Sequence, residues 1–419
     1  MSQKQAEGAE PEKTALNPKH HELKAVMTVF GAWEMPLWYP AGAIKEHLAV
    51  VTAAGLFDTS HMDVFFVEGA GSQSLLNYAF TRDLSVHKPN RALYGIFLNN
   101  QGCTIDDAVL YPLNPNRFAV VVNAGMGDAL VKHLSALHQT AGIKIFQPAA
   151  RLTKLDIQGP AAPAIVRSLF NDPELFADLP YFAFKGDFDF TRSRLKLADG
   201  TPVLLSRSGY TGEVGFELFA PLDRALPLWN AIAEAGTPRG LLPCGLAARD
   251  SLRTGAVLPL SHQDIGHWQF AHNPWLFALP LNAGKDAFTK TFLGSKALSA
   301  QNSDHCHTLP FVGFDQRRVD SHAGVVLHQG KEIGSILTIV SDMAIGRIDG
   351  AVVGITDHAR PADWTPKGLA CGFIKTSQSI ATGEKVVLRD TRREIEVEIV
   401  DDIRPNRTAR HKLANFPCA

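Results

Sequence analysis

Hydrophobic and polar positions follow two different spacings in the first third of the chain. Apolar residues at helical spacing predict helices at residues 43–54, 72–80 and 128–137. Alternating, β-rich runs predict strands at residues 63–68, 93–98, 104–110 and 118–122. Because short Asn/Gly and Asn/Pro turns separate the last three runs, they are typical of an antiparallel meander. This part of the chain therefore predicts an α+β unit.

The pattern starts again near residue 149 and changes once more after residue 300. A strand at 152–157, a turn at Gln158–Pro160 and a helix at 161–170 come first, and helices at 224–235 and 246–254 follow. Residues 285–301 are polar and mixed, as in a connector. Short alternating runs then occur at residues 309–314, 325–327, 335–340, 351–355, 385–388 and 394–400. These runs predict a small all-β domain, either a barrel or a double sheet.

Composition narrows the class of protein. The chain has 419 residues, of which 45% are hydrophobic and 20% charged, and its formal net charge is −1. Two or three domains are expected at this length. The charge balance gives no sign of a nucleic-acid or membrane-surface partner. No apolar run approaches the roughly 20 residues that span a bilayer. Residues 1–20 are polar and contain Pro11 and Pro18, which predicts a loose tail rather than a signal peptide.

The cysteines and histidines favour a reducing compartment and give no metal signature. There are five cysteines, an odd number, and none forms a Cys-x-x-Cys pair, so a cytoplasmic setting fits best. The histidines form only local clusters without spaced Cys or carboxylate partners, and we therefore expect no metal site.

Residues 206–218 concentrate chemistry in a short segment after the apolar run 202–205. Three glycines, Gly209, Gly212 and Gly215, allow the backbone to bend or to approach a ligand closely. If residues 215–219 form a strand, Phe216 and Leu218 share one face and Glu217 lies on the other. Two interpretations stay open from these residues alone: a glycine-rich hairpin with a solvated Glu217, or a carboxylate that reads a ligand rich in N–H donors.

Two adjacent carboxylates form a second candidate. Asp106 and Asp107 lie within an apolar strand, where neighbouring side chains point to opposite faces. At most one of them can then serve a given pocket, and the other can bind the backbone of the turn at Gly102. The alternative is that both are turn or edge residues.

Several segments resemble signatures of the glycine-cleavage T-protein (aminomethyltransferase) family, and they occur in the same order. Residues 206–218 resemble its R-x-G-Y-T-G-E-x-G-F-E signature, and residues 244–253 resemble its C-G-L-x-A-R-D-x-L-R helix. Residues 102–107 resemble a G-G-x-x-D-D segment, with Cys103 in place of the second glycine. Residues 30–36, followed by Glu46-His47 and residues 54–62, resemble its N-terminal signature, and weaker matches lie at residues 155–160 and 292–298. The resemblance covers residues from about 20 to 340.

This resemblance implies a fold and its division into domains. The expected fold is α+β, a three-domain cloverleaf with a barrel-like all-β domain at the C-terminal end. The expected parts are a flexible tail (1–20), a discontinuous folate-binding domain (21–62 with 148–284), a second α+β domain (63–147), and a connector with the β domain (285–419).

The resemblance also implies tetrahydrofolate-dependent one-carbon transfer. In the family, an aminomethyl group arrives on the lipoyl arm of the carrier H-protein, ammonia leaves, and methylene-tetrahydrofolate forms. Asp107 matches the catalytic carboxylate, which would stabilise the cationic stage and orient N5 and N10 of the folate. Glu217 matches the residue that accepts N–H groups of the pterin.

Four further residues match cofactor-binding positions of the family. Arg249 would bind the carboxylates of the folate tail or brace Glu217. Tyr94 and Tyr210 match aromatic positions that pack on the flat ring or donate a hydroxyl group, although ordinary core packing also suits each of them. Met62 ends the N-terminal signature and completes the expected set.

The chain departs from the family after Arg253. The usual L-E-A-G-L-x-L-Y-G-x-D-I is replaced by residues 254–265, and residues 266–277 are unusually aromatic. The same fold serves tetrahydrofolate-dependent demethylases of small methylated compounds, in which aromatic side chains and a proton donor would form the donor pocket. The candidates here are the wall Trp268, Phe270 and Trp275 with His61 or His267, unless these aromatic residues only pack in the core. A folate-binding protein without turnover is a third hypothesis, against which the retained Asp107 argues.

Overall fold

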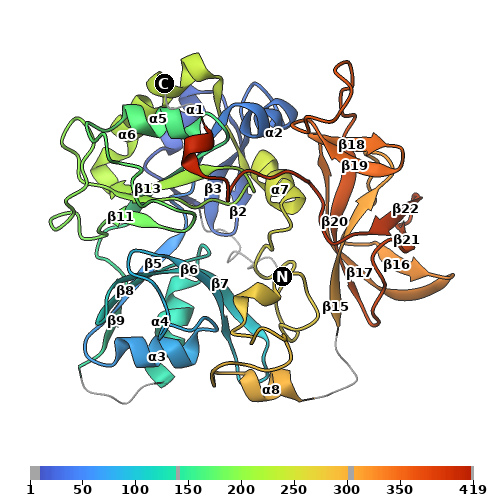
Figure 1. Cartoon of the computed structure of the whole chain (residues 1–419), viewed down its shortest axis with the longest axis horizontal. Helices are drawn as coiled ribbons and strands as arrows, with labels where there is room; N and C mark the ends of the chain where they lie inside the picture. The colour runs from blue at the N-terminus through green and yellow to red at the C-terminus, as the bar shows by residue number, and fades with distance from the viewer. Residues whose placement is uncertain (1–9, 138–141, 301–305, 417–419) are drawn as a thin grey trace.

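The computed structural model describes residues 10–137, 142–300 and 306–416. The chain passes from the upper left unit to the lower left unit, returns, and then forms a third unit on the right (Figure 1). Residues of all three units line a central hollow. Each unit is built on its own β-sheet. The predicted α+β architecture with a C-terminal barrel is confirmed. No helix in the described ranges is long and apolar enough to cross a membrane.

The first unit contains a mixed six-stranded sheet. In spatial order its strands are β11 (Phe184–Gly186), β12 (Leu204–Ser206), β13 (Gly215–Pro221), β10 (Leu152–Gln158), β4 (Ala54–Asp58) and β14 (Leu241–Pro243). Its helices are α2 (Ala43–Thr52), α5 (Ala162–Ser168), α6 (Ala225–Gly236) and α7 (Leu246–Gly255). Side chains alternate along the two central strands, so that Leu155, Phe216 and Leu218 enter the largest hydrophobic core of the first unit. Of their polar neighbours, Glu217 lines the central hollow.

The N-terminal segment is part of the first unit. It forms β1 (Glu12–Lys13), α1 (Asn17–Glu22), β2 (Val26–Phe30) and β3 (Trp33–Trp38). Leu16 is 1% exposed in the core, and His20 is buried with its Nε2 3.0 Å from Asp58 Oδ2. The loose tail predicted for residues 1–20 is therefore wrong for residues 14–20, because one apolar anchor and a buried polar partner hold them. Residues 1–9 lie outside the described residues.

The second unit is the predicted antiparallel meander with two additional strands. Its sheet runs β6 (Leu93–Leu98), β7 (Thr104–Asn114), β8 (Arg117–Val122), β5 (Asp63–Glu68) and β9 (Lys144–Phe146). The helices α3 (Ser72–Ala79) and α4 (Gly127–Leu137) pack together beside it. The inner ends of β6 and β7 bring Tyr94 and Asp107 to the central hollow.

The third unit is a closed six-stranded barrel. Its order is β15 (His307–Gly313), β20 (Leu369–Thr376), β17 (Lys331–Asp342), β16 (Val325–His328), β21 (Lys385–Arg389) and β22 (Glu394–Ile399). The run predicted at 351–355 does not join the barrel. It is β19 (Ala351–Gly354), which pairs only with β18 (Ile345–Ile348). The unpredicted β20 takes its place and pairs with both β15 and β17.

Short helical segments complete the chain. The expected connector contains α8 (Ser295–Ser299). Single 3₁₀ turns are η1 (Leu222–Arg224), η2 (Thr237–Arg239), η3 (Leu276–Ala278) and η4 (Leu413–Asn415).

A buried ionic network, His47–Asp342–Arg404–Glu213, joins the barrel to the first unit. After β22 the chain runs back across the molecule, as the red segment of Figure 1 shows. On this segment Arg404 donates to Asp342 Oδ2 at 2.6 Å and lies 3.4 Å from Glu213 Oε1. His47 Nε2 lies 2.9 Å from the other oxygen of Asp342. Arg404 also donates to the backbone oxygen of Thr211, so the network also anchors the glycine-rich segment 206–218.

Candidate functional site

The central hollow is a cavity of about 2700 Å³ that all three units line. Its wall includes β2, β6, β7, α7, the glycine-rich segment, the loop after α7 and part of the barrel. All six residues that the sequence predicted for the site line this cavity: Met62, Tyr94, Asp107, Tyr210, Glu217 and Arg249. The structure therefore brings the predicted set together, although the individual roles stay predictions.

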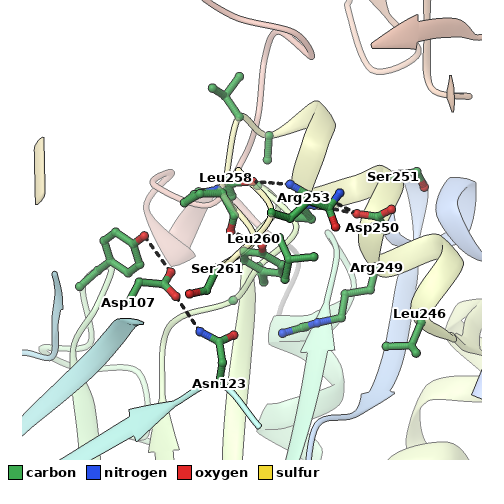
Figure 2. A pocket seen from close by; sticks show the side chains of 18 of the residues that line it. Asp107, Asn123, Leu246, Arg249, Asp250, Ser251, Arg253, Leu258, Leu260 and Ser261 are labelled. Atoms are coloured by element: carbon green, nitrogen blue, oxygen red, sulfur yellow. Dashed lines mark hydrogen bonds and ion pairs between the residues drawn. The ribbon is translucent and has the colours of Figure 1, made fainter. Parts of the chain in front are cut away.

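Asp107 is fixed at the cavity wall by two donors. The Tyr94 hydroxyl donates to Asp107 Oδ2 at 2.9 Å, and Asn123 Nδ2 donates to Oδ1 at 2.7 Å. Figure 2 shows the Asn123 side chain directed at Asp107, with Ser261 close to them. Burial raises the pKa of Asp107, and hydrogen bonds from Tyr94 and Asn123 oppose the rise. The carboxylate is thus held in one orientation.

Asp106 does not bind the turn at Gly102 as predicted. Its oxygens accept the backbone N–H of Asn123 at 3.1 Å, the Asn123 side chain at 2.8 Å and the Ser261 hydroxyl at 2.6 Å. Asn123 therefore bridges two carboxylates that were expected to act on separate faces. Burial and the neighbouring charge of Asp107 raise the pKa of Asp106 to about 7. A negative charge is held more easily on Asp107 than on Asp106.

The turn before these carboxylates tolerates Cys103. Only Gly102 adopts positive φ, at 76°, and Cys103 does not. The Asn99 side chain holds the turn by accepting the backbone N–H of Gln101 at 2.9 Å and of Cys103 at 3.0 Å. Replacement of the usual second glycine therefore costs no backbone strain.

Glu217 is a buried, paired carboxylate and not a solvated one. It is 8% exposed, and its two oxygens accept hydrogen bonds from Lys154 Nζ and the Ser208 hydroxyl. It lies on the face opposite Phe216 and Leu218, as predicted from the strand alternation. Lys154 was missed by the sequence reasoning.

Arg249 does not brace Glu217 directly. Its guanidinium donates to Asp156 Oδ2 at 3.2 Å and lies over the Tyr210 ring, 4.7 Å from the ring centroid. Figure 2 shows Arg249 extending from α7 into the pocket. The Tyr210 hydroxyl donates to the backbone oxygen of Pro259, which fixes the ring edge. Asp156 is a second residue that the sequence reasoning missed.

Two of the three glycines serve a side chain of the protein. A Cβ at Gly209 would lie 2.0 Å from Gln158 Oε1, and one at Gly215 would lie 2.3 Å from it. Gln158 Nε2 donates to the backbone oxygen of Ser208 at 3.2 Å. These glycines therefore make room for Gln158, whereas Gly212 supplies a turn with φ of 79°.

His61 is not suited to donate a proton at neutral pH. It lines the cavity, is 4% exposed, and its Nδ1 has no hydrogen-bond partner. Burial lowers the pKa of His61 to about 4, and the charges of Arg249 and Lys154 add to the effect. His61 is therefore neutral under ordinary conditions. His267, the other predicted donor, also lines the cavity.

The structure does not support the aromatic wall that was considered for a small-molecule donor. Trp268, Phe270 and Trp275 do not line the cavity. Phe270 and Trp275 are 2% and 0% exposed in a hydrophobic core shared with the barrel, and Trp275 Nε1 donates to a backbone oxygen. Phe277, which is 51% exposed, lines the cavity instead. The alternative of core packing therefore holds for Phe270 and Trp275, whereas Trp268 is half-buried with Lys375 over its ring.

Comparison with known proteins gives consistent matches. A family model described as the GCVT N-terminal domain matches residues 16–272. The aminomethyltransferase of Shouchella clausii is 34% identical over 354 residues, covering 83% of this chain and 90% of its own. That of Symbiobacterium thermophilum is 35% identical over 336 residues, covering 78% and 84%. The crystal structure of glycine cleavage system aminomethyltransferase T from Bartonella henselae superposes with a TM-score of 0.75 and 25% identity, covering 93% of this chain and 96% of that one.

Proposed function

Since the chain belongs to the GCVT family of aminomethyltransferases, we propose that it transfers a one-carbon unit to tetrahydrofolate within the glycine cleavage system. In this reaction an aminomethyl group leaves the lipoyl arm of an H-protein, ammonia is released, and methylene-tetrahydrofolate forms. Tetrahydrofolate is the acceptor substrate, and the lipoylated H-protein is the donor partner.

The observation that carries this proposal is a single cavity with two fixed carboxylates on different walls. Asp107 is presented by β7 of the second unit, and Glu217 by β13 of the first unit. A pterin offers a row of N–H donors at one edge and reactive nitrogens at the other side of its ring. Glu217 suits the first feature because a carboxylate accepts two parallel N–H bonds. Asp107 suits the second because the transfer develops positive charge near those nitrogens.

The residues around Asp107 prepare it for this role. Tyr94 and Asn123 hold its two oxygens from the protein side, so that no reorientation is needed as positive charge develops. Fixed orientation also contributes by aligning the reacting groups. The neighbouring Asp106 takes up a proton more easily, which limits the repulsion that two ionised carboxylates would cause.

A turnover assay with two donors tests the function. We expect ammonia release and methylene-tetrahydrofolate formation when aminomethylated H-protein and tetrahydrofolate are supplied together. Methyl transfer from small methylated sulfur, nitrogen or aryl-ether compounds should stay at background. Methyl-tetrahydrofolate formation without H-protein activity would contradict the proposal and favour a demethylase.

Replacement of the catalytic carboxylate separates chemistry from binding. Asp107→Ala should lower kcat by about 10²–10³-fold, the size typical of removing one electrostatic contact to a transition state. The dissociation constant for folate, measured by calorimetry, should change less than about threefold. The reason is that Glu217, the proposed recognition carboxylate, keeps its hydrogen bonds from Lys154 and Ser208. Asp128→Ala, on an exposed helix of the second unit, serves as the control. Loss of folate binding in Asp107→Ala would assign Asp107 to recognition and not to catalysis.

A further inference from the structure

Two buried carboxylates lie directly opposite each other beside the cavity. Asp156 on β10 is the antiparallel partner of Glu217 on β13, and they are 0% and 8% exposed. Like charges in such a cross-strand pair repel each other, and burial strengthens the repulsion. A positive charge between them is needed if both are to stay ionised.

Lys154 provides that charge with all of its donors engaged. It lies two residues before Asp156 on the same face of β10 and is 4% exposed. Its ammonium group donates to Asp156 Oδ1 at 2.6 Å, to Thr59 Oγ1 at 3.0 Å and to Glu217 Oε1. An ammonium group has three N–H donors, so none is left for a ligand. Lys154 therefore acts on other side chains of the site.

The second cation near this pair, Arg249, binds Asp156 and not Glu217. Arg249 donates to Asp156 Oδ2 at 3.2 Å, and the Thr59 hydroxyl donates to Asp156 Oδ1 at 2.8 Å. Glu217 has only Lys154 and the neutral Ser208 hydroxyl. The two carboxylates thus depend on Lys154 to different degrees.

Both neutral and charged groups lie near Glu217 on the other packed elements. The titratable or charged groups near Glu217 or its partners include Tyr111 on β7, Tyr181 before β11, Tyr210 in the glycine-rich segment, Asp58 on β4, His61 after it, and Arg249 on α7, with Arg207, Arg407 and Arg410 beside Tyr181. Burial raises the pKa of each of the three tyrosines and lowers that of His61, which leaves all four uncharged. Within the described part of the chain, Lys154 is the cation that forms an ion pair with Glu217.

We propose that Lys154 is a positioning residue for folate recognition, which keeps Glu217 ionised and fixes its plane so that both oxygens accept N–H groups of the pterin. This inference rests on the proposed function and assigns the residue that makes its recognition carboxylate work. Without Lys154, the opposed pair relieves its repulsion by binding a proton. That proton goes to Glu217, because Asp156 keeps Arg249 and Thr59. A protonated Glu217 would present an O–H donor to the N–H donors of the pterin, and folate binding would weaken.

The test measures folate binding as a function of pH in Lys154→Met. The ligand is 5-formyltetrahydrofolate, a stable folate with the same pterin edge, and the dissociation constant is measured by calorimetry from pH 6 to 8.5. For the wild-type protein we expect a constant value. For Lys154→Met we expect a value within about threefold of wild type at pH 8.5 that rises by up to about tenfold per pH unit as the pH falls towards 6.

Control variants separate positioning from general structure. Lys132→Met removes an exposed lysine on α4 and should leave the pH profile flat. Lys154→Arg keeps the charge and should restore most of the pH independence. If Lys154→Met does not fold, as judged by circular dichroism, Lys154→Gln replaces it with the same expected profile.

The outcomes distinguish this inference from the proposed function. A wild-type protein that does not bind the folate at any pH overturns the proposed function itself. A wild-type protein that binds, together with a folded Lys154→Met whose profile is as flat as wild type, overturns only the role of Lys154. Uniform weakening at every pH in Lys154→Met also overturns it, since that is the result of lost packing alone.

Discussion

Arg404→Met should loosen the joint between the barrel and the first unit. Arg404 is 2% exposed and belongs to the segment after β22, far in sequence from the groups that it binds. Methionine fills a similar volume without charge or donors. The substitution therefore tests the ionic network and not the packing around it.

The expected loss of stability in Arg404→Met follows from the groups that lose their hydrogen-bond or ion-pair partner. Asp342 loses a 2.6 Å partner but keeps His47, and the backbone oxygens of Thr211 and Leu252 lose donors. Removing one partner of a buried ion pair typically costs about 3–5 kcal/mol, because a charge stays buried without its counterion. We therefore expect the free energy of unfolding to fall by about 4 kcal/mol.

Urea unfolding followed by tryptophan fluorescence measures this loss. The matched control is Arg389→Met, which removes an exposed barrel arginine that lies 3.5 Å from Glu394. Exposed pairs contribute about 0–1 kcal/mol, so this variant should unfold almost as the wild type does. Because Arg404 also holds Thr211, Arg404→Met should weaken folate binding as well, whereas Arg389→Met should not.

A small effect would refute the reasoning. If Arg404→Met and Arg389→Met lower the free energy of unfolding by the same amount, below about 1 kcal/mol, the network does not join the units. Unchanged folate binding in a clearly destabilised Arg404→Met would retain the joint but refute its influence on residues 206–218.

Three further expectations follow from single contacts. Tyr94→Phe removes a hydrogen bond that favours ionised Asp107. Because a hydrogen bond to a charged group contributes about 1.5 kcal/mol, the acid limb of the kcat/KM profile should move to higher pH by about one unit. A pH–rate profile in which that limb does not move would contradict this. Gly215→Ala places a Cβ 2.3 Å from Gln158 Oε1 and should cost about 1–3 kcal/mol in urea unfolding. Gly354→Ala, whose added Cβ would meet its nearest atom at 3.7 Å and whose φ is not positive, should cost almost nothing. The third expectation concerns Asp58. Burial raises the pKa of Asp58, but hydrogen bonds and the nearby histidine outweigh it and lower the folded-state pKa from 3.8 to about 2. The stability that this gives is present above pH 4 and lost as the pH falls through 2. The gap of about 2 kcal/mol between wild type and Asp58→Asn should therefore close in acid, and a gap that persists at pH 2 would refute this assignment.

Strand alternation was sufficient to predict the face on which Glu217 lies. The same rule contained the signal for Lys154 and Asp156, which are two residues apart on a strand whose other face carries Leu155 and Ile157. Charged residues at spacing two in an otherwise buried strand indicate a paired polar face. The pairing with Glu217 itself depends on sheet register, which local sequence does not specify.

The errors have a common cause in contacts between distant segments. The barrel strand β20 has no alternation, because nearly all of its residues are buried, and it was not predicted. Trp275 packs against Phe373 of that strand, at 5.2 Å between ring centroids. Without β20, an aromatic residue next to a suspected pocket is easily assigned to the pocket wall. The close approach of Gly209 to Gln158 is equally invisible in the local sequence.

The segment after β22 also determines when, during synthesis of the chain, the site can be completed. Val214 donates its backbone N–H to the Thr408 hydroxyl at 2.9 Å, across a separation of 194 residues. At about 5–20 residues per second, a ribosome needs roughly 10 to 40 seconds to make the stretch between them. During that interval the nascent chain carries the glycine-rich segment without the residues that support it. The central cavity is therefore completed late in synthesis, after the barrel has emerged.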